Sequence, residues 1–214
     1  GLVGAVAAVA LFFITTPQMS IMYLLAIAAP TTFFCEKAVS RTGTSLKGWY
    51  SLSKLSLLLI VPPSFCFVLL TAYFWLYGQG LGFVFIEKTN EIFDLYITAL
   101  KGQGQNINPS LSKQLDGVKK SFADTAPALI SIFWMSLIVL NGLIAQFILK
   151  KSNRNQRPSF AIREVQIPRS FAVIFLSSLA LASFSSGELG YLVTNFTAIL
   201  AFPVMLTGLG VIHT

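Results

Sequence analysis

Long uncharged apolar stretches, separated by short polar segments, dominate the hydrophobicity pattern of this chain. A helix needs about 20 apolar residues to cross the hydrocarbon core of a bilayer, so each such stretch can be counted as a membrane span. The pattern predicts an all-α integral membrane protein, a single domain built as a bundle of about six transmembrane helices. The predicted spans are residues 1–15, 18–35, 53–78, 127–149, 169–186 and 190–212.

The connection between the third and fourth spans, residues 79–126, has a different pattern. Its apolar residues recur at steps of three and four over 83–100 and again over 110–122, with charged residues on the opposite face. The polar, glycine-containing segment 102–106 separates the two. The sequence therefore predicts two amphipathic helices, which either lie on the membrane surface or cap the bundle like a lid over an outward cavity.

The composition supports a membrane location. Apolar residues make up 55% of the chain and charged residues only 11%, with a mean hydropathy of +0.74, which is too little charge for the surface of a soluble domain. The net charge of +7 could indicate nucleic-acid binding. Because the cations are confined to loops beside apolar stretches, they are better explained by membrane topology, and we expect membrane lipid and no nucleic acid as a partner.

Basic residues concentrate in two connections, and this predicts the orientation. Residues 36–54 carry four cations against one acid, and residues 150–169 carry six against one. The positive-inside rule places both in the cytoplasm. The connection 79–126 has five lysines balanced by five acidic residues and no arginine, so we expect it outside. With six spans, successive connections alternate between the two sides of the membrane, and this alternation agrees with all three assignments.

Missing motifs argue against an enzyme. The chain contains no phosphate-binding loop of the G-x-x-x-x-G-K-[ST] type. Its single histidine, His213, stands near the end, so the chain can assemble neither a histidine-based zinc site nor a Ser-His-Asp triad. Cys35 and Cys66 lack the spacing of a metal or redox motif. We expect no catalytic residues, no metal and no cofactor.

Four residues near the predicted outer ends of spans form a candidate ligand site. They are Trp134, Glu188, Thr194 and Asn195. Polar side chains inside a membrane are costly and need an explanation, which is either packing between helices or function. Aromatic rings at one depth indicate an interfacial belt or the wall of a small-molecule pocket. In the second interpretation Glu188 and Asn195 orient the ligand.

The first predicted span has a face of small residues that includes Gly4, Ala7 and Ala8. Such a face allows close approach of another helix, either within the bundle or from a partner. The sequence also begins at Gly1 without an initiator methionine and stops as a span ends. We therefore expect a segment of a longer protein.

Short features along the chain resemble those of a known family. They are the opening Gly1–Ala5, Trp49-Tyr50 before the third span, Asn141 with Ala145-Gln146, Arg157-Pro158, Pro168, and the closing segment 208–213. The chain resembles the YybS-like family of uncharacterised bacterial membrane proteins, which is itself similar to the S components of energy-coupling factor transporters. The resemblance implies a bacterial inner-membrane protein that binds a vitamin-like molecule near the outer face and depends on a partner complex containing ATPases. The docking face would then be Gly4, Ala7 and Ala8.

Two functional hypotheses follow. The first is an S-component-like transporter subunit that binds a small molecule inside the bundle and works with an ATPase-containing partner. The alternative is a non-transporting membrane scaffold or assembly factor, whose basic cytoplasmic face contacts anionic lipid or a cytosolic partner. A cavity lined by Trp134, Glu188 and Asn195 favours the first, and a filled bundle favours the second.

Overall fold

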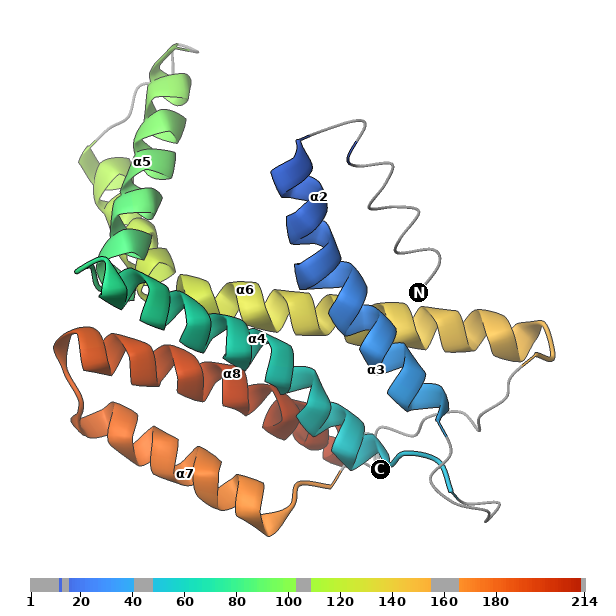
Figure 1. The fold of residues 1–214 in the computed structure, drawn as a ribbon. Coiled ribbons are helices and arrows are strands. Elements are labelled where there is room, and N and C mark those ends of the chain that lie inside the picture. Colours follow the sequence, from blue (N-terminus) through green and yellow to red (C-terminus); the bar gives the residue numbers. More distant parts are fainter. Residues whose placement is uncertain (1–11, 13–15, 41–47, 103–108, 155–165, 213–214) are drawn as a thin grey trace. The chain divides into compact units, whose positions relative to one another are not determined.

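The computed structural model of the chain describes residues 12, 16–40, 48–102, 109–154 and 166–212 (Figure 1). Within these ranges the regular elements are helices, which confirms the predicted all-α class. In chain order they are α2 (Pro17–Tyr23), the π-helix η1 (Leu24–Ala28), α3 (Ala29–Val39), α4 (Leu52–Leu76), α5 (Leu81–Gly102), α6 (Pro109–Lys151), α7 (Arg169–Phe184) and α8 (Gly187–Ile212).

The chain divides into two compact units. The first comprises residues 1–62, 134–168 and 203–214, and the second comprises 63–133 and 169–202. The divisions fall inside α4, α6 and α8, so each of these helices contributes to both units.

In the first unit, α2, η1 and α3 follow one another directly, and the residues at their junctions keep helical dihedral angles. The N–H of Ala29 bonds to the carbonyl of Leu24, five residues back, which is the hydrogen bond of a π-turn. Pro30 follows immediately and has no N–H to donate, so a local change of hydrogen-bond register at this point is expected. The predicted span 18–35 lies inside this helical run.

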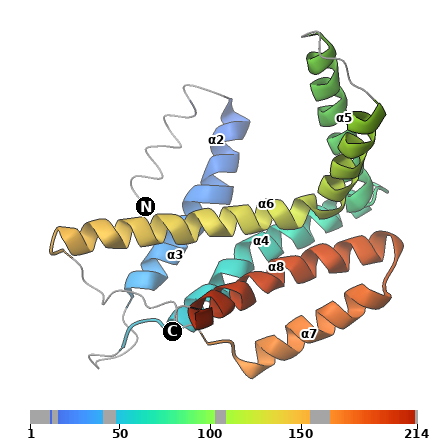
Figure 2. The same ribbon diagram turned by 180° about the vertical axis from the view of Figure 1, so that it is seen from behind.

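The second unit contains two helical hairpins. Figures 1 and 2 show α7 folded back along α8, and α5 beside the first part of α6. Gly187, at the turn between α7 and α8, has a φ of +62°, a left-handed conformation that glycine adopts without steric cost. Ile199, Leu200 and Phe202 of α8 are among the buried apolar residues of this unit.

Helix α6 corrects one prediction. The sequence pattern separated an amphipathic helix at 110–122 from a span at 127–149, whereas α6 runs without interruption for 43 residues and contains Pro127. Figures 1 and 2 show α6 changing direction between the part beside α5 and the part that follows. A proline inside a helix removes one backbone hydrogen bond and is an established cause of such a bend.

Three helices in the described part of the chain are long and apolar enough to cross a membrane. They are Leu52–Leu76, Leu111–Lys151 and Gly187–Leu209. Helix α7 is apolar but has only 16 residues, fewer than the roughly 20 that a straight crossing needs. The predicted span 1–15 lies outside the described residues except for Phe12.

Candidate functional site

Polar contacts join α5, α6 and α8 inside the second unit and involve two of the four predicted ligand residues, Glu188 and Asn195. We call this cluster the polar junction. Its members are Gly80, Gly82, Ala123, Asp124, Ala128, Glu188, Tyr191 and Asn195.

Asn195 of α8 is almost completely buried, with 1% of its surface exposed. Its Oδ1 accepts a hydrogen bond from the N–H of Ala128 at 3.1 Å, and its Nδ2 donates to the carbonyl of Asp124 at 2.9 Å. An unbroken α-helix would pair these two groups of α6 with each other. Nδ2 also donates to the carbonyl of Tyr191 at 3.0 Å. Both polar atoms of the amide are therefore bonded to backbone groups of the chain.

Tyr191 lies one turn before Asn195 on α8, and its hydroxyl donates to the carbonyl of Ala123 at 3.2 Å. That carbonyl is the one that residue 127 would satisfy in a regular helix, and Pro127 has no N–H with which to do so. Unpaired backbone carbonyls are costly in an apolar environment. Two side chains of α8 thus supply hydrogen bonds at the point where proline interrupts the ladder of α6.

Glu188 lies in the first turn of α8 and reaches the beginning of α5. Its Oε1 accepts a hydrogen bond from the N–H of Gly82 at 3.0 Å. The first N–H groups of a helix have no acceptor within that helix, and the helix dipole favours a negative charge there. Glu188 therefore caps α5 from a residue more than 100 positions away in the sequence.

Two glycines make this cap sterically feasible. A Cβ atom at Gly80 would lie 2.6 Å from Oε2 of Glu188, and one at Gly82 would lie 2.9 Å from the same oxygen and 3.1 Å from the ring of Tyr191. Real Cβ atoms essentially never approach another atom to within 3.0 Å, so a side chain at either position would displace the Glu188 carboxylate. The glycines therefore let the carboxylate and the ring lie directly against the backbone of α5.

The structure brings two of the four predicted ligand residues into the polar junction. Glu188 and Asn195 both belong to it, although they contact different elements, α5 and α6 respectively. Thr194 is exposed on α8. Trp134 is half-buried and falls in the first unit. The predicted docking residues Gly4, Ala7 and Ala8 lie outside the described residues.

Sequence reasoning did not place Tyr191, Gly80 and Gly82 in the candidate site, and it did not connect that site with Pro127, whose missing N–H the polar junction compensates. Two features of the sequence could have indicated them. Glu188, Tyr191 and Asn195 are spaced by three and four residues, which places them on one helix face. Pro127 stands at the start of a predicted span. Because it has no N–H, it cannot bond to the carbonyl four residues before it, and that carbonyl needs another donor.

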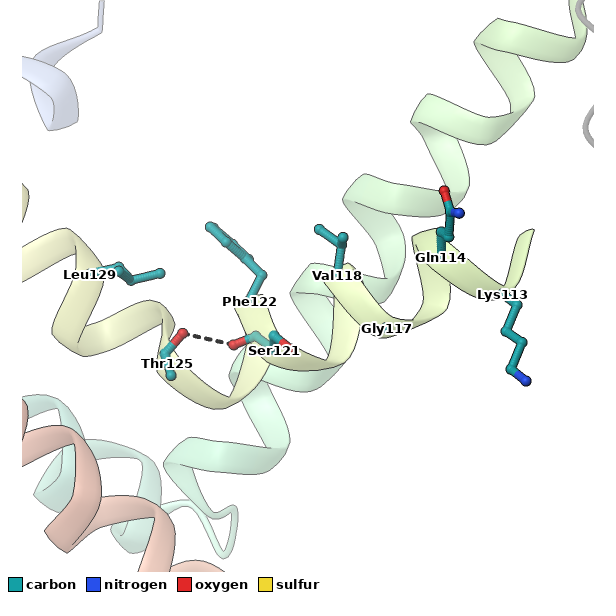
Figure 3. A pocket seen from close by; sticks show the side chains of 8 residues that line it. All are labelled: Lys113, Gln114, Gly117, Val118, Ser121, Phe122, Thr125 and Leu129. Carbon is teal, nitrogen blue, oxygen red and sulfur yellow. Dashed lines mark hydrogen bonds between the residues drawn. The ribbon is translucent and has the colours of Figure 1, made fainter. Parts of the chain in front are cut away.

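An open apolar depression lies on α6, next to but separate from the polar junction (Figure 3). Val118, Phe122 and Leu129 supply its large apolar side chains, and the lining residues all belong to α6. None of Trp134, Glu188, Thr194 and Asn195 lines it. Its chemistry suits an apolar surface rather than a polar small molecule.

Charged side chains lie on the exposed surface of α5 and α6. Lys119 of α6 and Asp94 of α5 form an ion pair at 3.2 Å that links the two helices. Within α5, the ammonium group of Lys88 donates a hydrogen bond to the carboxylate of Glu91 at 2.8 Å, and this bond and the negative charge of Glu91 raise the pKa of Lys88 above its ordinary value. Neither pair is buried, so each contributes little to stability.

Metal binding has no support from the described side chains. Nowhere in these ranges do three His, Cys, Asp or Glu residues come together in an arrangement that could hold an ion. Cys35 and Cys66 are both exposed free thiols.

Three such long apolar helices in the described part of the chain are typical of the class of integral membrane proteins. Comparison with protein families agrees with this assignment. Residues 1–214 match the family described as "Predicted membrane protein (DUF2232)", and the chain belongs to that family. No curated protein and no solved structure matches it.

Proposed function

We propose that this chain acts as a non-transporting membrane scaffold or assembly factor. The observation that supports this proposal concerns Asn195, the buried polar residue of the predicted ligand site. Its side chain is hydrogen-bonded to backbone groups of the chain itself. Its amide oxygen and nitrogen are bonded to Ala128, Asp124 and Tyr191. The polar junction thus shapes and orients helices, as a structural subunit requires.

The same contacts count against ligand binding at Asn195. A ligand could use this amide only by displacing its bonds to α6, which would release the buried N–H of Ala128 and the partly buried carbonyl of Asp124 beside Pro127 and remove two contacts between α6 and α8. Each such group costs about 1–3 kcal/mol when unsatisfied. A small molecule would have to offset this cost before it gained any affinity. No catalytic step, metal or cofactor forms part of the proposal.

The proposed topology retains six spans, with 36–54 and 150–169 in the cytoplasm and 79–126 outside a bacterial inner membrane. Support for a span near 18–35 comes from the continuous helical run of α2, η1 and α3. Support for one at 169–186 comes from α7, whose exposed Val173, Leu176 and Phe184 suit an apolar surrounding. The charge distribution along the sequence supports the sidedness.

Native mass spectrometry of the full-length protein, extracted gently from its own membrane, tests the proposal. A scaffold is expected to carry lipid and a stoichiometric protein partner without an ATPase. A stoichiometric metabolite, or a complex that contains ATPase subunits, would overturn it. An Asn195→Ala variant provides a second measurement, because the scaffold proposal expects changes in complex assembly and none in bound metabolite.

The second candidate function is a small-molecule-binding transporter subunit of the YybS-like, S-component-like kind. Glu188 is the observation that favours it, since this exposed carboxylate is held in a fixed position by the N–H of Gly82. The ligand site would then include Trp134, Thr194 and Asn195, and Gly4, Ala7 and Ala8 would dock an ATPase-containing partner.

Two variants test the transporter candidate separately. Glu188→Gln retains an acceptor for the Gly82 N–H but loses the charge, so it is expected to reduce the amount of bound metabolite without unfolding the protein. Ala8→Leu is expected to abolish co-purification of the ATPase partner and to leave the metabolite in place. Unchanged metabolite in the first variant and an unchanged complex in the second would exclude these assignments.

A further inference from the structure

A stripe of apolar side chains runs along the first part of α6 and is exposed. We call Leu111, Val118, Phe122 and Leu129 the α6 stripe. Their spacing of seven, four and seven residues places them on one helix face. Val118 is 57% exposed, Phe122 42% and Leu129 46%. The exposed charged residues Asp116, Lys120 and Asp124 occupy the opposite face.

The α6 stripe continues through the bend. The depression lined by Val118, Phe122 and Leu129 takes residues from both sides of Pro127. Figure 3 shows these three side chains pointing to the same side of the helix. Figure 3 also shows them on the concave side of the bent helix, so the α6 stripe occupies the inner side of the bend.

The length of α6 requires part of it to lie outside the hydrocarbon core. At about 1.5 Å per residue its 43 residues extend about 65 Å, roughly twice the thickness of that core. Figures 1 and 2 show the first part of α6, together with α5, running across the direction of the neighbouring α4 and α8 in the second unit. The candidate membrane span of α6 runs from Leu111 to Lys151, and its uncharged stretch, residues 125–149, makes up the later part of the helix.

These directions define which face of the hairpin meets the membrane. If the later part of α6 crosses the bilayer, the inner side of the bend is the side that faces the bilayer. The α6 stripe also leads directly to Ile130 and Phe133, which are exposed large apolar residues in the membrane-spanning part. The apolar surface is therefore continuous from the crossing helix into the hairpin.

From this continuity we propose that α5 and the first part of α6 form an interfacial hairpin, whose α6 stripe is immersed at the boundary between lipid headgroups and acyl chains. Amphipathic helices bind membranes in this manner. Figure 3 shows the side chain of Lys113 pointing to the other side of the helix from the α6 stripe, so its ammonium group lies on the water side of the proposed hairpin. The proposal does not depend on the scaffold function.

The charge of the hairpin indicates the kind of lipid surface. The connection 79–126 carries five lysines and five acidic residues, so its formal net charge is zero. Electrostatic attraction to anionic lipid therefore contributes little, and the apolar area determines binding. We expect immersion to be equal in zwitterionic and in partly anionic membranes.

A fluorescence-quenching experiment on the full chain tests the proposal. In a Cys35→Ser, Cys66→Ser background, Phe122→Cys and, separately, Val118→Cys are labelled with an environment-sensitive fluorophore. Asp116→Cys on the charged face of the same helix is the matched control. Each labelled protein is reconstituted in phosphatidylcholine vesicles, with or without about one quarter phosphatidylglycerol, and exposed to iodide or to phosphatidylcholine carrying a nitroxide near its headgroup.

The labels at positions 118 and 122 are expected to be quenched by the lipid nitroxide at least about threefold more strongly than the label at 116, in both lipid mixtures. Iodide is expected to quench in the reverse order. Equal iodide quenching at all three positions would overturn the proposal, because the α6 stripe would then face water. Protection of positions 118 and 122 from both quenchers would also overturn it, since a protein partner or a second copy would then cover the stripe.

Discussion

The side-chain oxygen of Asn195 on α8 accepts the hydrogen bond of the Ala128 N–H on α6 at 3.1 Å, across 67 residues of sequence. The amide nitrogen of the same side chain bonds to the carbonyl of Asp124, the usual partner of that N–H. Asn195 is thereby inserted into the backbone hydrogen-bonding of another helix. This contact holds α6 against α8 immediately beside Pro127, where α6 is least able to maintain its own structure.

Replacement of this amide should therefore destabilise the protein. Asn195→Ala is expected to lower the free energy of unfolding by about 2 kcal/mol, because the buried Ala128 N–H and the partly buried Asp124 carbonyl lose their hydrogen bonds to α8. Denaturant titration of the protein in mixed micelles measures this change. Thr194→Ala, at the exposed neighbouring position, is the control and is expected to change stability by less than about 0.5 kcal/mol. Equal stability of the two variants would show that the Asn195 contacts contribute nothing.

The effects of substituting Tyr191 and Pro127 on the free energy of unfolding should be coupled, because the Tyr191 hydroxyl bonds to the carbonyl that Pro127 leaves without an N–H. Tyr191→Phe removes the hydrogen bond to the Ala123 carbonyl and is expected to cost about 1 kcal/mol. Pro127→Ala restores a backbone N–H that can satisfy the same carbonyl, so Tyr191→Phe should cost less in that background. A double-mutant cycle on unfolding free energies is expected to give a coupling of about 0.5 kcal/mol or more. Strictly additive effects would contradict this account.

These contacts explain which parts of the fold the sequence could predict. Hydrophobic periodicity located α4, α7 and α8 closely, since the predicted spans 53–78, 169–186 and 190–212 differ from them by only a few residues at either end. The amphipathic pattern at 83–100 likewise corresponds to α5. Such patterns are local, and the helices that they specify form largely from local and bilayer constraints.

The predicted gap between 110–122 and 127–149 failed for a reason outside the local sequence. Pro127 is a legitimate helix-breaking signal, and its usual consequence is avoided because Tyr191 and Asn195 provide hydrogen bonds from α8. Hydropathy carries no information about a partner more than 60 residues away. The continuity of α6 could therefore not be predicted without the packing of α8 against it.

The candidate site was identified in part. Glu188 and Asn195 were selected because polar residues near membrane spans need partners, and both have partners in the structure. The sequence could not distinguish a ligand from a backbone group as that partner. Gly80 and Gly82 went unnoticed because the requirement for glycine arises only from the approach of the Glu188 carboxylate.

The ion pair between Asp94 and Lys119 should make a small, salt-sensitive contribution to the α5–α6 hairpin. Asp94→Asn is expected to lower the free energy of unfolding by no more than about 1 kcal/mol at low salt, with the difference disappearing near 1 M salt. Glu91→Gln, which breaks a pair within α5 alone, is the control for charge loss. Amide hydrogen exchange should quicken at the contact between the two helices in Asp94→Asn and not in Glu91→Gln. The same exchange pattern in both variants would show that the ion pair does not link the helices.

The effects of substituting Gly80 and Glu188 on the free energy of unfolding should not add. A Cβ atom at position 80 would displace the flexible carboxylate, so Gly80→Ala is expected to remove the cap of the Gly82 N–H, at a cost of about 1 kcal/mol. Glu188→Ala removes the same cap, and the double variant should therefore be no less stable than Glu188→Ala alone. Gly117→Ala is the matched control, because a Cβ there meets no atom within 4 Å. Alanine is the better helix former, so this control should be as stable as the parent protein or slightly more stable. Denaturant titration of the parent protein and the four variants decides the question. Full additivity of Gly80→Ala and Glu188→Ala would mean that the glycine serves something other than the approach of the carboxylate.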